Sequence, residues 1–331
     1  MKNRIISFYR KNKKAVLLVT RIVISASLIA FLIKTQIKDF SDIIEILKSS
    51  DKVLLLLSLS THALGTYITA VRWKALLNTQ EVKLSTATLS VTVLIGSFFN
   101  NFLPTSIGGD VFRTYDASKK AKIPLGTSAS VILVERFSGV VSAATYAVVA
   151  LFLGFTAIGH RSVIIPIVIF FVVTVILAFL IINPSLFRFG KFKFMRKLKE
   201  KLSNVYNTLV SFKKYKVVLL KVLVYGFLLQ FAVILNWWLA AKALGINLTL
   251  TAFIFIVPVV ATIAMIPISI GGIGLRENSL VFIMVAMGVT NEKAALCSLL
   301  ILFMIILMGI VGGIIYIVRP YFESRSKKND T

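Results

Sequence analysis

The sequence contains few of the residues that build metal centres, disulfides and many enzyme active sites. Among its 331 residues there are one cysteine, Cys297, and two histidines, His62 and His160. A single cysteine excludes an intramolecular disulfide, and no zinc-ligand spacing is present. Acidic residues are also scarce, with 13 Asp and Glu against 38 Lys and Arg. We therefore expect no metal and no cofactor, and an enzyme that works through a nucleophile or a metal is disfavoured.

Hydrophobic residues, by contrast, are abundant and lie in long runs. They make up 57% of the chain, and the mean hydropathy is +0.89. This composition predicts an integral membrane protein. The net charge of +25 is then explained by basic loops that face anionic lipids, rather than by a surface that binds nucleic acid. The first apolar run, 15–33, is too long for the core of a signal peptide and lacks a clear cleavage site, so we expect it to remain as an anchor.

The predicted fold is an all-α polytopic membrane domain over residues 15–318, with about six to eight transmembrane helices. A basic N-terminus (1–14) and a basic tail (319–331) are expected to lie in the cytoplasm. The segment 36–50 has its apolar residues on one helical face, which predicts an amphipathic helix on the outer membrane surface. The apolar runs that follow are 52–71, 85–103, 127–155, 162–182, 217–244, 250–268, 278–290 and 294–318.

The distribution of basic residues indicates that one apolar segment does not cross the membrane. The loop 183–216 contains ten Lys and Arg residues and should be cytoplasmic by the positive-inside rule. If all three apolar runs between residues 85 and 182 crossed the membrane from a cytoplasmic N-terminus, this loop would lie outside. The conflict disappears if 85–113 enters the membrane and returns to the cytoplasm. Pro104 and the glycine pair that follows it supply the break that such a re-entrant segment needs.

A motif with one proline, two glycines and an arginine occurs twice. Residues 103–113 and 266–276 match at six of eleven positions, namely Pro, Ser, Ile, Gly, Gly and Arg. Their separation is about half the chain, so we predict a duplicated unit with halves at about 15–165 and 166–318. The second copy enters from the opposite side, which predicts an inverted repeat of two re-entrant, broken-helix hairpins. The charge pattern leaves open whether 250–290 is re-entrant or crosses twice.

Ionisable residues within apolar segments are candidates for function, because burying their charge in a membrane is costly. Three acidic residues in these segments each have an arginine nearby in sequence. Such an arginine can bind phosphate together with the free backbone N–H groups of a helix that starts after Gly-Gly. The alternatives are ion pairs that hold the broken helices and, for the two asparagines, packing between helices. The candidate substrate-binding residues are Asn100, Asn101, Gly108, Gly109, Asp110, Arg113, Glu135, Arg136, Gly271, Gly272, Arg276 and Glu277.

Other polar or small residues in the apolar runs have simpler interpretations. We expect His62 and Lys221 to be structural or to extend toward the interface. Arg72 is expected to close the span 52–71 on the cytoplasmic side. The pair Gly312-Gly313 predicts close packing of the last helix.

Three motifs occur in order along the chain. They are Asn101-x-x-Pro104-x-x-x-Gly108-Gly109-Asp110-x-x-Arg113, Glu135-Arg136-x-x-Gly139, and Pro267-x-x-x-Gly271-Gly272-x-Gly274-x-Arg276-Glu277. Over about 15–318 the chain thereby resembles the lysylphosphatidylglycerol synthase transmembrane family. The resemblance implies a flippase-like membrane part that moves aminoacylated phospholipid between leaflets, and in full-length members a soluble part that makes this lipid from aminoacyl-tRNA. Eleven residues follow Pro320, so we expect the soluble part to be absent, which disfavours a phosphatidylglycerol lysyltransferase.

The function predicted from these features is flippase- or scramblase-like movement of a phosphate-bearing lipid, such as an aminoacylated phospholipid, across the plasma membrane. The three arginines would contact phosphate, and the carboxylates would position them, bind a cationic headgroup or take up a proton. The absence of a Gly-x-x-x-x-Gly-Lys motif means that ATP is not the direct driver.

The expected partners are a lipid phosphate headgroup and anionic membrane lipids, with no nucleic acid. A homo-oligomer and a separate lipid-synthase partner stay open. The alternative functions are a membrane enzyme or accessory subunit of lipid modification, a transporter of a glycolipid or polyprenyl-phosphate carrier, and an assembly partner whose motifs serve packing only.

Overall fold

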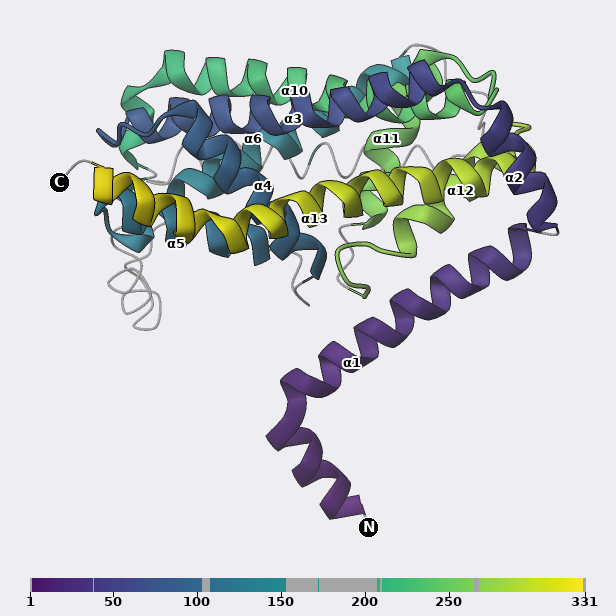
Figure 1. Ribbon diagram of the computed structural model, residues 1–331, viewed down its shortest axis with the longest axis horizontal. Coiled ribbons are helices and arrows are strands. Elements are labelled where there is room, and N and C mark those ends of the chain that lie inside the picture. Colours follow the sequence, from purple (N-terminus) through teal and green to yellow (C-terminus); the bar gives the residue numbers. More distant parts are fainter. Residues whose placement is uncertain are drawn as a thin grey trace.

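The computed structural model describes residues 2–37, 39–102, 108–152, 172, 207–208, 210–264 and 268–329. The regular structure of these residues is helical (Figure 1). Five helices are long and apolar enough to span a membrane, namely α1 (Lys2–Gln36), α3 (Lys52–Asn78), α6 (Leu125–Phe152), α10 (Lys216–Ala243) and α13 (Asn291–Asn329). They confirm the all-α polytopic fold. Almost all of the run predicted at 162–182 and most of the loop 183–216 lie outside the described residues.

Four shorter helices make up the two repeated motifs. They are α4 (Thr86–Phe102), α5 (Gly108–Ala121), α11 (Leu250–Ala264) and α12 (Leu275–Ala286). The twelve residues of α12 give about 18 Å of helix at 1.5 Å per residue, which is well short of a hydrocarbon core of about 30 Å. The helix pairs α4–α5 and α11–α12 are therefore two broken-helix hairpins, and the re-entrant alternative for 250–290 is favoured.

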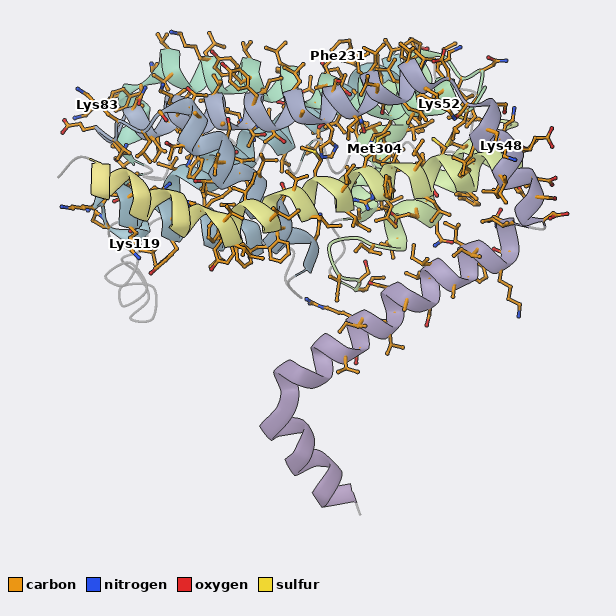
Figure 2. All side chains as sticks on the ribbon, viewed as in Figure 1. Lys48, Lys52, Lys83, Lys119, Phe231 and Met304 are labelled. Atoms are coloured by element: carbon orange, nitrogen blue, oxygen red, sulfur yellow. The ribbon has the colours of Figure 1, made fainter. Side chains whose placement is uncertain are left out.

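The two hairpins lie at opposite ends of the bundle. In Figure 1, α4 and α5 lie toward the end where α13 finishes, whereas α11 and α12 lie toward the end that carries α2 (Phe40–Ser49). Lys83 and Lys119 mark the first end, Lys48 and Lys52 mark the second, and Phe231 lies on the long side between them (Figure 2). Charged side chains at both ends and an apolar side are expected of a bundle whose long axis crosses a membrane. This arrangement is the one that the predicted inverted repeat requires, and the repeat itself stays a prediction.

The last helix packs closely on the first hairpin through glycines. A Cβ atom placed on Gly312 would collide with the carbonyl oxygen of Leu94, and one placed on Gly313 would lie 2.7 Å from the ring of Phe98. Because only hydrogen fits at these points, α13 and α4 approach backbone to backbone. The close packing predicted for Gly312-Gly313 is thus confirmed.

The first helix contacts the bundle only through its C-terminal half. Its earlier part leads away from the other helices (Figure 1), whereas Leu32 is fully buried in the core. After it, Asp39 caps α2 by accepting a hydrogen bond of 2.8 Å from the backbone N–H of Ser41, and this bond lowers the pKa of the Asp39 carboxyl. Ile43 of α2 packs on the core while Ile44 is exposed, as expected of a helix at a membrane surface.

Candidate functional site

A cavity lies between the long helices and the second hairpin. Its volume is about 430 Å³, and its walls come from α3, α4, α10, α11 and α13 and from the start of α12. Most of its lining surface is apolar, but eight of the lining side chains are polar. These are Thr61, His62, Thr66, Thr69, Ser97, Gln230, Asn236 and Arg276.

The hydroxyl groups in this lining are held by their own helices. The Thr69 hydroxyl donates to the carbonyl of Gly65 at 2.8 Å, and the Ser97 hydroxyl donates to that of Val93 at 3.2 Å. Their donors are therefore used, and their oxygen lone pairs remain as acceptors. Among the described residues, neither the imidazole of His62 nor the side-chain amide of Gln230 has a hydrogen-bond partner. The cavity thus offers neutral donors and acceptors for a ligand.

Arg276 is the charged side chain of the described lining, and its neighbour Glu277 sets its position. Nε of Arg276 donates to Oε1 of Glu277 at 2.8 Å, and Nη2 lies 2.6 Å from the same oxygen. The other carboxylate oxygen, Oε2, accepts the backbone N–H of Gly274 at 2.6 Å. Glu277 is 1% exposed, so both of its oxygens are engaged inside the protein. Nη2 is buried and makes no well-directed hydrogen bond, while 14% of the Arg276 side chain is exposed.

The backbone before Arg276 requires glycine. Gly271, Gly272 and Gly274 have φ of +56°, +77° and +85°, values that residues with a Cβ atom rarely adopt. Gly274 also leaves no room for a side chain, because a Cβ there would lie 2.5 Å from Cβ of Leu28 in α1. The same turn is tied to α1 by a hydrogen bond of 3.0 Å from the Ile270 N–H to the hydroxyl oxygen of Ser25. This tight turn places Arg276 at the start of α12, against the cavity.

The first hairpin instead carries a network of five ionised groups. Arg72, Arg113 and Glu135 are buried, Asp110 is partly buried and Arg136 is exposed. Glu135 of α6 is 2% exposed and binds Arg72 of α3 through one oxygen at 3.0 Å and Arg113 of α5 through the other at 2.7 Å. Asp110 of α5 pairs with Arg113 at 3.6 Å and also with Arg136 of α6. The network joins three helices around a single carboxylate. Arg72 was expected at the cytoplasmic end of its span, but it is buried because α3 continues to Asn78 and meets Glu135.

An aromatic ring and two asparagines complete the anchoring of the first hairpin. The guanidinium of Arg113 lies 4.3 Å from the ring centre of Trp73, a cation–π contact. Oδ1 of Asn100 accepts the backbone N–H of Gly109 at 2.8 Å, which satisfies a free donor at the start of α5. Asn101 donates to the carbonyl of Ile305 in α13 at 2.9 Å. These contacts agree with the alternative that the asparagines serve packing between helices.

The two motifs meet where the hairpins turn. A Cβ on Gly271 would lie 3.4 Å from the carbonyl oxygen of Asn100, so the second turn touches the end of α4. Within the first hairpin, a Cβ on Gly109 would collide with the carbonyl oxygen of Gly96, which brings α4 and α5 into close contact. The repeated motifs therefore face each other inside the bundle, as an inverted repeat requires.

Comparison with known proteins agrees with this architecture. Residues 18–313 match the family described as lysylphosphatidylglycerol synthase TM region. The chain belongs to this family. A UPF0104 membrane protein of Methanocaldococcus jannaschii is 32% identical over 95 residues, which is 28% of this chain and 28% of that protein. A UPF0104 membrane protein of Pyrococcus horikoshii is 26% identical over 301 residues, which is 82% of this chain and 89% of that protein.

The match is to a transmembrane region, and together with the five long apolar helices it makes this member of the lysylphosphatidylglycerol synthase TM family a multi-pass membrane protein. The resemblance drawn from the three sequence motifs is confirmed. The family's name refers to lipid synthesis, but the region of the family that matches this chain is described as its TM region.

The candidate residues of this family member fall into two groups. Asp110, Arg113, Glu135 and Arg136 come together in the ion network, whereas Arg276 lies at the cavity and Glu277 beside it. The sequence analysis did not place Arg72, His62 or Gln230 among the candidate site residues, since His62 was expected to be structural and Arg72 to close its span. The sequence did contain a signal for Arg72. Glu135 is a buried carboxylate and needs a positively charged partner. Arg136, one position along the same helix, points in another direction and does not provide it.

Proposed function

We propose that this protein moves a phosphate-bearing lipid between the two leaflets of the plasma membrane, with the lipid headgroup passing along the polar side chains of the cavity. One observation carries the proposal. The cavity lies within a membrane-spanning bundle, next to a hairpin whose turn directs Arg276 into its wall. A headgroup that crosses the apolar core unaided leaves its polar groups unsatisfied, so a polar path inside the protein lowers the barrier.

Arg276 is the residue that we assign to phosphate contact. A guanidinium is planar, permanently charged and weakly hydrated, which suits a phosphate in a partly dry site. Its ion pair with Glu277 holds it in place, and its side chain is 14% exposed. Arg113 and Arg136 are engaged by carboxylates of the network, so their contact with phosphate stays a prediction from sequence. In the proposal the network anchors the first hairpin while the second presents the ligand-binding charge.

Exchange of lipid in reconstituted vesicles tests this function. Liposomes are prepared with a phospholipid that is fluorescent on its acyl chain, and a membrane-impermeant reductant quenches the outer leaflet. The wild-type protein should let the inner pool be quenched, and Arg276→Gln should slow this exchange by about tenfold or more, as expected for a lost charge-assisted hydrogen bond.

The matched control is Arg319→Gln. Arg319 also pairs with a carboxylate, that of Asp116 at 2.9 Å, but it is absent from the cavity lining. This variant should exchange lipid at the wild-type rate. Equal rates for folded Arg276→Gln and wild type would overturn the assignment of Arg276, and no exchange by the wild type would overturn lipid movement. A new lipid species in the vesicles would instead support the enzyme alternative.

We also propose that both termini, and the end of the bundle that holds α4 and α5, face the cytoplasm. The protein suits a labelling test because Cys297 is fully buried and should not react with a thiol reagent. Lys119→Cys and Lys48→Cys place one reporter at each end (Figure 2). An impermeant reagent added to intact cells should label the variant at residue 48 and not the variant at residue 119, and the reverse result would invert the orientation.

A further inference from the structure

We infer that two polar contacts of α3 close the cavity along its length and act as gates, an inference that rests on the proposed function. The contact toward the end of the bundle that holds α4 and α5 is charged, and the one toward the end that carries α2 is neutral. A headgroup would enter and leave the cavity as the two contacts open in turn.

One face of α3 carries the cavity lining and both contacts. The residues of α3 that line the cavity are Thr61, His62, Gly65, Thr66 and Thr69. Ser58 lies one turn before them and Arg72 one turn after them, on the same helical face. At 1.5 Å per residue, Ser58 and Arg72 are about 21 Å apart, which fits within a hydrocarbon core of about 30 Å. The partners of these two residues therefore bound the cavity along α3.

The contact at Arg72 is charged. Arg72 binds Oε1 of Glu135 at 3.0 Å, and Arg113 binds Oε2 at 2.7 Å. On α10, Gly226 lies one turn from the lining residue Leu229, and a Cβ on Gly226 would be 3.6 Å from Nη1 of Arg72. The three ionised side chains are buried, so water does not reach the cavity through them. They separate the cavity from the first end of the bundle.

The contact at Ser58 is neutral. The Ser58 hydroxyl donates to the backbone carbonyl of Asn236 in α10 at 2.8 Å, and the Asn236 amide donates to the backbone carbonyl of Ser58 at 2.6 Å. The sulfur of Met304 in α13 lies 3.5 Å from the same hydroxyl. All three residues are buried, and Asn236 also lines the cavity. This contact joins α3, α10 and α13 between the cavity and the second end of the bundle.

Polar contacts suit gates because water can replace them. Groups that separate into a hydrated passage exchange one hydrogen bond for another, so the net cost of each bond is small. A transporter that exposes its site to one side at a time needs a barrier on both sides. Hydrogen bonds to ionised groups are about twice as strong as neutral ones. The contact between Ser58 and Asn236 should therefore open more readily than the one between Arg72 and Glu135.

A cysteine placed in the cavity tests the two gates separately. Thr66→Cys puts a thiol on the lining between them, and Cys297 is fully buried and should not react. An impermeant thiol reagent is added to intact cells or to inverted membrane vesicles, and Lys48→Cys and Lys119→Cys identify the side that each preparation exposes. The reagent should label Thr66→Cys about fivefold faster from the side of residue 48, because the neutral gate is the weaker one.

Weakening one gate should open the cavity to one side only. In the Thr66→Cys protein, Asn236→Leu should raise the labelling rate about tenfold from the side of residue 48, and Arg72→Gln should raise it about tenfold from the side of residue 119, as expected when such hydrogen bonds are lost. Arg319→Gln is the control, because Arg319 pairs with Asp116 and is absent from the cavity lining. It should leave both rates unchanged.

Thermal unfolding in detergent checks that the variants fold. If Arg72→Gln does not fold, Arg72→Lys takes its place, and Ser58→Ala likewise replaces Asn236→Leu. Both substitutes should change labelling less, on the same side as the variant that they replace.

The side on which each variant acts distinguishes a gate from a contact that only stabilises the fold. Weakening a purely structural contact would raise labelling from both sides or from neither, and either result would overturn the inference. Faster labelling of Thr66→Cys from the side of residue 119 would overturn the order of the two gates. If the wild type exchanges no lipid while labelling stays side-specific, the proposed function fails and the two barriers stand.

Discussion

The two hairpins carry the same motif, yet different interactions hold them in place. In the first hairpin, Arg113 is buried in an ion network with Glu135 and Asp110, which ties α5 to α3 and α6. In the second, the turn is held by glycine geometry and by a hydrogen bond from the Ile270 N–H to the Ser25 hydroxyl of α1, and Arg276 reaches the cavity. One copy of the motif thus buries its arginine among charged partners on other helices, and the other places its arginine at the cavity.

A difference in spacing explains this divergence. The first motif places its carboxylate three residues before the arginine, so Asp110 and Arg113 share one helical face. The second places Glu277 directly after Arg276, where its side chain turns back to the Gly274 N–H. The first arginine is therefore drawn toward partners on other helices, whereas the second is paired within its own turn. Four substitutions test this difference between the two hairpins.

The largest effect is expected from Glu135→Gln in the first hairpin. This change removes the counter-charge of buried Arg72 and one of the two carboxylates that pair with Arg113. Removing one partner of a buried ion pair costs about 3–5 kcal/mol. The shift of the unfolding midpoint in detergent, from thermal or denaturant titration, measures this loss of stability. Glu45→Gln, at an exposed position of α2, is the control and should change stability by less than about 0.5 kcal/mol. Equal stability of the two variants would show that the network does not anchor the hairpin.

The next effect concerns the turn of the second hairpin, tested by Gly274→Ala. A backbone with positive φ strains alanine by about 1–3 kcal/mol, and the collision with Leu28 adds about 1–3 kcal/mol of overpacking. Gly288→Ala is the matched control, because Gly288 has φ of +86° but nothing within 4 Å of its Cβ position. Both should lose stability, and Gly274→Ala should lose more. Equal losses would mean that α1 does not support the second turn.

A smaller effect is expected from Gly109→Ala, which tests the contact between α4 and α5. The new methyl group would collide with the carbonyl oxygen of Gly96, and overpacking of this kind costs about 1–3 kcal/mol. Gly139→Ala is the comparison, since its Cβ position lies 3.5 Å from the nearest atom, Nη1 of Arg72, an ordinary contact distance. The unfolding midpoints of both variants in detergent compare their stabilities. A variant at residue 109 that is as stable as the one at residue 139 would contradict close packing in the first hairpin.

The smallest effect is expected from Ser25→Ala. It removes the acceptor of the Ile270 N–H, and an unsatisfied donor of this kind costs about 1 kcal/mol or slightly more. Hydrogen exchange of the peptide that contains Ile270 should accelerate, while that of α5 should not change. Ser60→Ala is the control, because the Ser60 hydroxyl donates only to its own helix, at Leu56. Unaltered exchange at Ile270 would show that α1 and the second hairpin are not coupled through this bond.

Part of this architecture could be predicted from the sequence because lipid imposes simple rules. An apolar run long enough to cross the membrane must be helical, so the segments around 52–71, 217–244 and 294–318 were recognisable from composition. The repeated Pro, Gly-Gly and Arg positions and the basic loop 183–216 predicted two inverted hairpins. These signals are local or periodic, and each depends on residue type alone.

The cavity and the ion network could not be predicted in the same way. Glu135 binds Arg72, which is 63 positions away, and nothing in the periodicity of either helix specifies that pair. His62 and Gln230 looked like ordinary polar residues of a span, and only the packing of α3 against α10 places both at one cavity. Long-range pairing of side chains depends on how helices rotate and cross, which no single segment encodes.

Hydrophobic length and basic loops are read residue by residue, so the chain's own letters suffice to predict a membrane-embedded helical bundle, and a repeated breaker motif predicts two similar, oppositely oriented halves. Which arginine is buried among ion-pair partners and which one lies at the cavity emerged only from the packing of the helices. The physical reason is that a charge inside a membrane protein takes its role from the partners that other helices bring to it, and those partners lie far apart in the chain.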